Sequence, residues 1–364
     1  MKKMIYLIVA VLMTGCSSEP EFVVKGNIQD SDSVTFMLQK REAGKFITLD
    51  SALSRNGIFK MTGSVQFPEM VQLVATGRQK RVSFYIENSE ITISGNLDSL
   101  SFAEVSGSKT QDEYQSFIDS NKPLSEKYSN LYIEYQSARQ ENNTEKIAEL
   151  EKEAEAIQNE MTQLEKDFVK NNPSSYVSPS ILNSLSFEME ASDIEAAINA
   201  MDTNVAKIPV VKDLMARAQV MKAVAIGQKA PDFTLNDVNG NPVSLSSKMG
   251  TKLLLIDFWA GWCNPCRQEN PNVVRVYKEF NKKGFDVFGV SLDRTKDEWV
   301  EAIAADKLTW THVSDLEYWN NAAAKLYAVN AIPANFLLDE NGIIIARNLR
   351  GEDLYNKVKE TLGK

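Results

Sequence analysis

The sequence is poor in the residues that build structural cross-links and metal sites. It contains three cysteines and a single histidine, His312, in 364 residues. A disulfide framework needs several cysteine pairs, and a structural zinc site usually needs four cysteine or histidine ligands. We therefore predict no metal site and no disulfide framework. His312 lies in a predicted strand far in sequence from both later cysteines, so it is interpreted as structural and not as part of a Cys–His protease pair.

Positive charge is also scarce. Lysine and arginine number 40 against 49 acidic residues, and the formal net charge is −9. An acidic protein gains no attraction from phosphate backbones, which excludes nucleic acid as a partner. The hydrophobic share of 43% and the charged share of 24% are those of a globular protein. The length predicts two or three folded units.

The amino terminus lacks an apolar run of transmembrane length. Ten apolar residues, Met4 to Met13, follow Lys2 and Lys3. As a helix they would rise about 15 Å, half of a hydrocarbon core of about 30 Å. The run therefore predicts a signal peptide, with a short buried helix as the alternative. The following Thr14-Gly15-Cys16 resembles the lipobox of bacterial lipoproteins, and an ordinary signal peptide with a chance cysteine is a further alternative.

We expect residues 1–16 to be this leader segment, ending at the lipidated Cys16. A lipid anchor attaches a protein to a membrane without a transmembrane helix. The expected location is the bacterial cell envelope, facing an extracytoplasmic compartment.

Residues 21–108 are predicted to form an antiparallel β domain of the sandwich or open-barrel kind. Short runs of alternating apolar residues, such as Arg81–Ile86 and Glu90–Ser94, follow one another along this segment. Glycine, asparagine and aspartate separate the runs, as at Arg55-Asn56-Gly57. The segment carries no cluster of histidine, cysteine or paired carboxylates. It is interpreted as a folded platform for packing or partner contact.

Residues 109–225 are predicted to be helical. Between Glu145 and Lys170, seven apolar residues recur at spacings of three and four, which places them on one stripe of a helix. Asn142 is the predicted N-cap of this helix. The segment from about Asp112 to Gln140 can pair with it as a helical hairpin. A homodimer joined through the apolar stripe is the alternative.

Residues 226–364 are predicted to form an α/β domain. All five tryptophans and two of the three cysteines lie in this segment. Continuous apolar strands joined by helices predict a mostly parallel sheet covered on both faces. The predicted strands and helices are Leu253–Trp259, Gln268–Phe280, Phe285–Leu292, Asp297–Ala305, the hairpin of Ala334–Leu338 with Gly342–Ala346, and Glu352–Leu362.

Cys263 and Cys266 follow directly on the first of these strands. Two intervening residues at the start of a helix bring both sulfurs within bonding range. Unpaired amides and the dipole at a helix start favour a thiolate on the first cysteine, and the thiolate is the attacking species in disulfide exchange. Pro265 has no N–H to lose in this first turn. We predict a redox-active disulfide without a further cofactor, in which Cys263 attacks and Cys266 resolves.

Other uses of a lone Cys-x-x-Cys pair fit less well. A zinc site would need a second pair of ligands. A haem-attachment motif would need histidine after the second cysteine, where Arg267 stands. A structural bridge over two residues would stabilise the fold little.

Asp257 lies in the middle of the apolar strand before the cysteines. Burial disfavours an ionised carboxylate, so we expect a raised pKa. A near-neutral acid beneath the cysteines can exchange a proton with Cys266, and Asp257 is therefore predicted to be catalytic. A hydrogen-bonded buried aspartate without a catalytic role is the alternative.

The run Asp257-Phe258-Trp259-Ala260-Gly261-Trp262-Cys263-Asn264-Pro265-Cys266 resembles the active-site segment of thioredoxins. Together with Ala230-Pro231-Asp232-Phe233-Thr234-Leu235, Val290-Ser291-Leu292-Asp293 and Ala331-Ile332-Pro333, it resembles the TlpA/ResA family of extracytoplasmic thioredoxin-like proteins. The resemblance covers residues 226–364 and implies a thioredoxin-like fold there. The preceding β and helical segments resemble the uncharacterised amino-terminal region of many lipoprotein members.

The resemblance also implies how a substrate binds. Pro333 would be a cis-proline facing the cysteines, which leaves the Ile332 backbone free to pair with an extended substrate peptide. Trp262 would form an apolar docking surface with Pro333, and Pro265 completes the predicted substrate contacts. Taken without the resemblance, Pro333 could equally be a trans loop residue.

The sequence is therefore interpreted as a thiol–disulfide oxidoreductase that acts on exported proteins carrying cysteines or disulfides. Reduction is favoured, because Asn264-Pro265 is closer to the dipeptide of thioredoxin than to that of strong oxidants. A membrane electron donor is the expected partner.

Two alternatives remain. The first is a thiol peroxidase of the peroxiredoxin type, because Ala230-Pro231-Asp232-Phe233 also opens such proteins. Ile256 and Ala260 stand where their proline and hydroxyl residue would be, however. The second is a surface lipoprotein that binds partners through residues 21–225 without catalysis.

Overall fold

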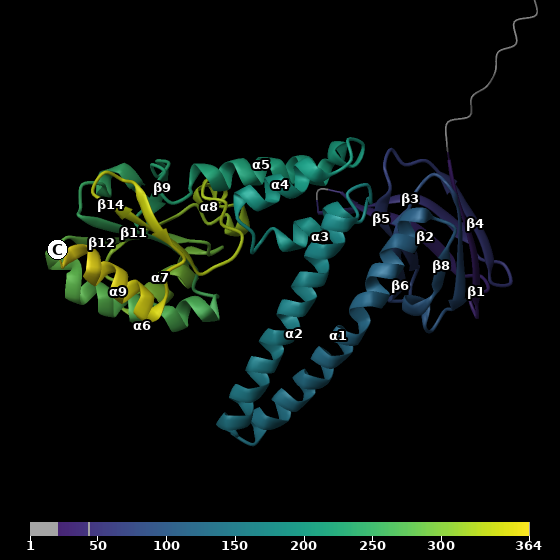
Figure 1. The fold of residues 1–364 in the computed structure, drawn as a ribbon, viewed down its shortest axis with the longest axis horizontal. Coiled ribbons are helices and arrows are strands. Elements are labelled where there is room, and N and C mark those ends of the chain that lie inside the picture. The colour runs from purple at the N-terminus through teal and green to yellow at the C-terminus, as the bar shows by residue number, and fades with distance from the viewer. Residues whose placement is uncertain (1–20, 43, 364) are drawn as a thin grey trace, which may run out of the picture. The chain divides into compact units, whose positions relative to one another are not determined.

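The computed structural model describes residues 21–42 and 44–363 (Figure 1). The chain divides into two compact units. One contains the residues up to Leu182 together with Met201–Ile208, and the other contains Asn183–Ala200 together with Pro209–Lys364. Cys16 and the predicted signal peptide lie outside the described residues. Within the described ranges, no helix combines the length and the apolar character needed to cross a bilayer.

The first unit begins with two four-stranded sheets, ordered β4-β1-β7-β8 and β3-β2-β5-β6. Inward-facing residues of both sheets form one core, in which Phe36 of β2 stacks on Phe59 of β4 with ring centroids 4.5 Å apart. The predicted β domain is thus confirmed. Among the described strand pairs of these sheets only β1 and β7 run parallel. The strands are β1 (Phe22–Gln29), β2 (Thr35–Glu42), β3 (Lys45–Leu53), β4 (Ile58–Gly63), β5 (Glu69–Ala75), β6 (Lys80–Ile86), β7 (Glu90–Asn96) and β8 (Glu104–Ser106).

The predicted helical hairpin follows as α1 (Lys109–Gln140) and α2 (Thr144–Asn171), which lie side by side in Figure 1. The apolar stripe of α2 packs on α1, and Leu150 and Ile157 are 1% exposed each. A homodimer through this stripe would have to displace α1.

The predicted N-cap of α2 was wrong by one residue. Asn143 caps α2, and its side chain accepts the Lys146 N–H at 3.0 Å. Asn142 instead takes a left-handed conformation, with φ +54°, in the turn that leaves α1. A residue in that conformation belongs to the turn, so the next asparagine, with φ −83° and ψ 87°, takes the non-helical N-cap position.

Three shorter helices continue the helical segment, namely α3 (Ser178–Leu185), α4 (Ala191–Ala200) and α5 (Pro209–Ala223). Helices α4 and α5 belong to the second compact unit. They are joined by an ion pair between Lys222 and Glu195, and Glu190 just before α4 pairs with Arg347 of the C-terminal sheet. The unit that holds both later cysteines therefore starts upstream of residue 226.

The second unit is built on a seven-stranded sheet of order β10-β9-β13-β12-β11-β14-β15. The described pairs β11–β12 and β12–β13 are parallel, and the other four are antiparallel. The prediction of a mostly parallel sheet was therefore wrong. Two hairpins, β9–β10 and β14–β15, flank a parallel centre, and a tight hairpin turn imposes antiparallel pairing. The strands are β9 (Thr234–Asp237), β10 (Pro242–Ser244), β11 (Leu253–Trp259), β12 (Phe285–Ser291), β13 (Thr311–Ser314), β14 (Ala334–Asp339) and β15 (Ile344–Arg347).

Helices cover both faces of this sheet, as predicted. Successive residues of a strand point to opposite faces. Asp257 of β11 points toward the side of α6, where it interacts with Glu269, whereas the ring of Phe258 packs on Tyr327 beside α8. The helices are α6 (Asn264–Phe280), α7 (Lys296–Asp306), α8 (Ala322–Leu326) and α9 (Gly351–Leu362). This α/β arrangement brings the end of β11 and the start of α6 together at one edge of the sheet.

Candidate active site

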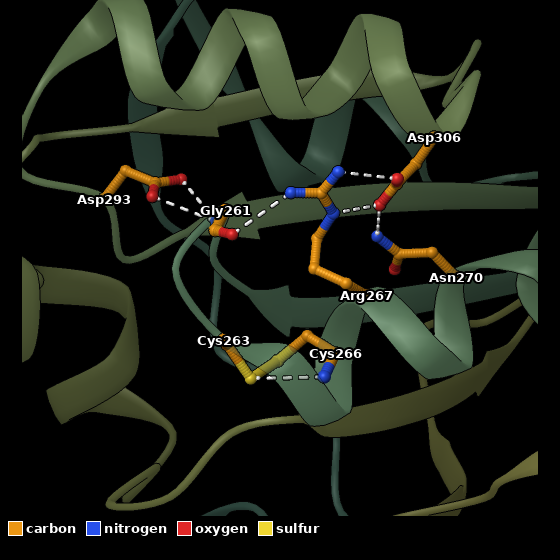
Figure 2. A network of polar contacts seen from close by, with 7 residues as sticks. All are labelled: Gly261, Cys263, Cys266, Arg267, Asn270, Asp293 and Asp306. Atoms are coloured by element: carbon orange, nitrogen blue, oxygen red, sulfur yellow. Dashed lines mark hydrogen bonds and ion pairs between the residues drawn. A yellow bond between two sulfur atoms is a disulfide. The ribbon is translucent and has the colours of Figure 1, made fainter.

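The cysteine pair lies where β11 passes into α6. Cys263 is the N-cap of α6, which begins at Asn264, four residues before the predicted helix start at Gln268. The two cysteines form a disulfide with their Cα atoms 5.3 Å apart. The Cys263 Sγ accepts the Cys266 N–H at 3.2 Å, and Pro265 lies between them in the first helical turn (Figure 2). One otherwise unpaired amide of the helix start is thus directed at the Cys263 sulfur.

The two sulfurs differ in their surroundings. Cys266 is completely buried, whereas Cys263 keeps 4% of its surface exposed. The Cys263 Sγ also lies 3.7 Å from the carbonyl oxygen of Ile332. Only the first cysteine therefore offers an edge that a second molecule can reach.

The loop that faces Cys263 contains the cis peptide bond Ile332–Pro333. This is the isomer that the resemblance implied. The Arg350 guanidinium, from the segment before α9, donates to the carbonyl of Pro333 and, at 2.8 Å, to that of Leu349. Arg350 thereby ties the proline loop to the base of α9.

Asp257 lies on β11, the strand that leads to the cysteine pair, and is 5% exposed. Burial raises the pKa of its carboxyl to about 7, the positive charge of Arg350 opposes this shift, and the charge of Glu269 adds to it. The expected rise of the pKa is confirmed, while the proton-transfer role stays a prediction. Glu269, one turn beyond Cys266, accepts the Gly351 N–H at 2.8 Å.

The loop before Cys263 is held at both polar atoms of the Gly261 backbone (Figure 2). Asp293 accepts the Gly261 N–H at 2.9 Å, and Arg267 donates to its carbonyl at 3.2 Å. Arg267 also pairs with Asp306 at the end of α7, and the amide of Asn270 donates to the same carboxylate at 2.6 Å. These contacts position the loop whose next residue is Trp262.

Trp262 is 41% exposed beside the cysteines. Its indole N–H donates to the carbonyl of Leu292 at 3.3 Å, and its ring lies 5.1 Å from Tyr318 and 6.1 Å from Trp319. Its ring neighbours are thus Tyr318 and Trp319, so the predicted joint surface with Pro333 stays a prediction.

Sequence reasoning missed three residues of this site, namely Arg350, Asp293 and Glu269. Asp293 had a signal, because an acidic residue directly after a buried strand is well placed to receive loop amides. Glu269 lies on the same helix as Cys266 and could have been found from its spacing. Arg350 had no such signal in the sequence, because only the folding of the chain brings it to Pro333.

His312 is structural in its surroundings. It is buried between the rings of Trp259 and Trp310, with centroids 5.4 and 5.6 Å away, and burial lowers its pKa to about 3. In the part of the chain that the structure describes, no three histidine, cysteine or acidic residues gather closely enough to hold a metal ion.

Comparison with known proteins identifies the C-terminal unit. Residues 226–347 match the AhpC/TSA family, and residues 22–114 match a domain of unknown function, DUF4369. The thiol-disulfide oxidoreductase ResA of Geobacillus kaustophilus is 33% identical over 135 residues, which cover 36% of this chain and 75% of that protein. The chain belongs to the ResA/TlpA-like family of thiol–disulfide oxidoreductases.

Two further proteins are similar to about a third of the chain. The thioredoxin-like protein YneN of Bacillus subtilis is 38% identical over 120 residues, which cover 32% of this chain and 68% of that protein. The solved thioredoxin domain of a thiol-disulfide oxidoreductase from Bacteroides vulgatus is 39% identical, covers 38% of this chain and 98% of that one, and gives a TM-score of 0.36. The similarity to the ResA oxidoreductase shows that the chain is an oxidoreductase enzyme, and Cys263 and Cys266 are its Cys-x-x-Cys pair.

The match to the AhpC/TSA family brings no peroxide site. Ile256 and Ala260 are completely buried, and neither side chain carries a hydroxyl group. The hydroxyl and the proline that orient a peroxide in the peroxidase alternative are therefore missing from these positions.

Proposed function

We propose that the chain is an exported, lipid-anchored reductase of protein disulfides. One observation carries the proposal: the Cys263 sulfur accepts a helix-start amide and has an open edge, while Cys266 is completely buried behind it. This asymmetry supports Cys263 as the attacking residue and Cys266 as the resolving residue.

The reaction balances as two thiolate displacements. The Cys263 thiolate attacks a substrate disulfide, forms a mixed disulfide and releases one substrate thiolate. The Cys266 thiolate then attacks the Cys263 sulfur, closes the enzyme disulfide and releases the second substrate thiolate. The substrate gains two electrons, which an electron donor in the membrane must return to the enzyme.

Asp257 is proposed to accept the proton of Cys266. A carboxyl with a pKa of about 7 exchanges protons readily at neutral pH. Burial prevents bulk water from doing the same. The extended substrate would pair with the Ile332 backbone, which already lies next to the Cys263 sulfur. Trp262, Pro265 and Pro333 would complete the surface on which the substrate lies.

The charges near the pair support reduction over oxidation. A strong oxidant is one whose reduced, thiolate form is stabilised. Here the Cys263 sulfur has one amide donor and one carbonyl oxygen as neighbours. The partial negative charge of the carbonyl oxygen opposes the amide, disfavours a thiolate and so favours the enzyme's disulfide form.

The proposed location follows from the amino terminus. Lys2 and Lys3, the apolar run and Thr14-Gly15-Cys16 support export and lipidation. The substrates are therefore proposed to be exported proteins with cysteines or disulfides in an extracytoplasmic compartment of a bacterium.

The test compares insulin-disulfide reduction by the wild type, Cys263→Ser and Cys266→Ser. We expect Cys263→Ser to be inactive and Cys266→Ser to accumulate a mixed disulfide on Cys263, seen by mass spectrometry. Equal rates for wild type and Cys263→Ser would end the enzyme mechanism. An equilibrium potential against glutathione close to the value of about −120 mV for a strong oxidant, and not to about −270 mV, would overturn the direction.

A further inference from the structure

A groove runs along the cis-proline side of the redox site. Its first hollow, of about 290 Å³, is lined by Pro333 and Ala334 on one side and by Met221 and Val224 on the other. A second hollow, of about 420 Å³, is lined by Trp319 and Lys325. The two share Phe187 and Arg217, so they form one groove. All of these residues belong to the second compact unit.

Each hollow has a lining residue close to the redox pair. In the first hollow, Pro333 follows Ile332, whose carbonyl oxygen lies 3.7 Å from the Cys263 sulfur. In the second hollow, the ring of Trp319 lies 6.1 Å from that of Trp262, the residue before Cys263. A polypeptide held against the Ile332 backbone therefore has the groove beside it. The groove can therefore contact the side chains of residues next to the substrate cysteine.

Arg217 is a half-buried cation in the wall of this groove. Its Nη1 donates to the Ser186 hydroxyl at 2.7 Å, and its guanidinium lies 4.6 Å above the ring of Phe187. These contacts fix the orientation of the side chain without neutralising it. Its Nε is buried and has no hydrogen-bond partner among the described residues. Burial also lowers the Arg217 pKa, which reflects the cost of a desolvated charge.

The other charges of the groove leave this cation uncompensated. Arg347 is already paired with Glu190. Lys325 donates to the Asn320 side chain at 3.1 Å, and within the described ranges it makes no ion pair. Glu188 is exposed at the groove lining and makes no ion pair with Arg217. Arg217 and Lys325 are thus two cations of the groove lining without an ion-pair partner among the described residues.

We propose that this groove binds an acidic segment of the substrate polypeptide, so that disulfides flanked by aspartate or glutamate are preferred. The guanidinium of Arg217, which lines both hollows, attracts the incoming carboxylate, and Lys325 adds a second positive charge. The exposed rings of Phe187 and Trp319 pack on the neighbouring apolar atoms. This inference rests on the proposed function, because it names the substrates of that reaction.

The first test uses peptides with one cysteine, each linked as a disulfide to thiopyridine. The cysteine is flanked by glutamate, glutamine or lysine in otherwise identical sequences. For the reduced wild type at low salt, we expect the rate constant for the glutamate peptide to exceed that for the glutamine peptide roughly three- to tenfold. Arg217→Gln should lower this ratio at least threefold, and Arg217→Lys should retain most of it. Salt should lower the wild-type ratio.

The matched control is Lys212→Gln. Lys212 lies on the same helix, is exposed and does not line the groove, so the same loss of charge should leave all rates unchanged. Lys325→Gln provides a second groove variant in case Arg217→Gln does not fold. Equal rates for the three peptides with the wild type would overturn the groove proposal while leaving the reductase mechanism standing.

A binding measurement separates the two proposals. The same peptides with serine in place of cysteine are titrated into the oxidised wild type by calorimetry. Binding of the glutamate peptide at least threefold tighter than the glutamine peptide supports the groove even where no thiopyridine is released. Suppose instead that thiopyridine is released from all three peptides at equal rates and that all three bind equally tightly. This outcome would contradict the acidic-substrate proposal and leave the redox mechanism standing.

Discussion

Asp257, Arg350 and Glu269 form a small set of interacting charges, in which Asp257 is buried and the other two are half-buried. The carboxyl of Asp257, the guanidinium of Arg350 and the carboxylate of Glu269 influence one another, and Arg350 also holds the Pro333 carbonyl. Because burial dominates, the Asp257 pKa lies near neutral pH. The protonation state of one residue thus changes over the pH range in which such an enzyme works.

Asp257→Asn tests this set of charges through stability. A carboxyl whose pKa is about 7 when folded and about 3.8 when unfolded favours folding below pH 3.8, and this contribution is lost as the pH rises through 7. We expect Asp257→Asn to raise the free energy of unfolding at pH 8 by up to about 4 kcal/mol, and by less than about 1 kcal/mol at pH 4. Urea unfolding at both pH values measures this. Equal effects at both would contradict the raised pKa.

The same variant also tests the proton-transfer role. Asp257→Asn should slow the resolving step and accumulate the Cys263 mixed disulfide, with alkylation of Cys263 largely unchanged. Unchanged turnover of Asp257→Asn at neutral pH would contradict a proton-transfer role for Asp257.

The site residues that could be predicted are those that lie close together in the sequence. Cys263, Cys266 and Asp257 lie within ten residues of one strand–helix junction, so their chemistry could be predicted from spacing and burial alone. Arg350 comes from another part of the chain and meets the site only through tertiary packing. No local pattern distinguishes it from any other surface arginine.

At the scale of elements, the helical hairpin shows what periodicity can predict. The stripe of α2 was readable because a spacing of three and four residues defines one helix face whatever lies opposite. The identity of the opposing surface is a tertiary property, and the structure shows that α1 provides it. The prediction of mostly parallel pairing in the C-terminal sheet was wrong for the same reason. An apolar strand has the same sequence pattern in a parallel and in an antiparallel sheet.

Ile157→Ala tests the packing of this hairpin. Ile157 is 1% exposed in a small core shared by α1 and α2. Its truncation should lower the free energy of unfolding of the first unit by about 2–4 kcal/mol, measured by urea unfolding followed by circular dichroism. Glu160→Ala, at an exposed position of the same helix, is the control and should change it by less than about 0.5 kcal/mol. A small loss for Ile157→Ala would mean that the stripe is not a core in solution.

At the scale of the whole molecule, the proposed anchor can be tested without touching the redox unit. Cys16→Ser should move the protein from the membrane fraction to the soluble fraction of cells, because a lipid anchor needs the thiol. Wild-type protein should resist extraction by high salt and yield to detergent. Retention of Cys16→Ser in membranes washed with high salt would contradict lipidation.

The packing of α4 and α5 into the redox unit has an evolutionary consequence. The match to the AhpC/TSA family spans residues 226–347, but Phe187 and Arg217 come from upstream of it. Under the groove proposal, mutation of the upstream segment changes which substrate proteins bind without altering the cysteine chemistry. Related proteins in one cell can then differ in their substrates while they share the same electron donor.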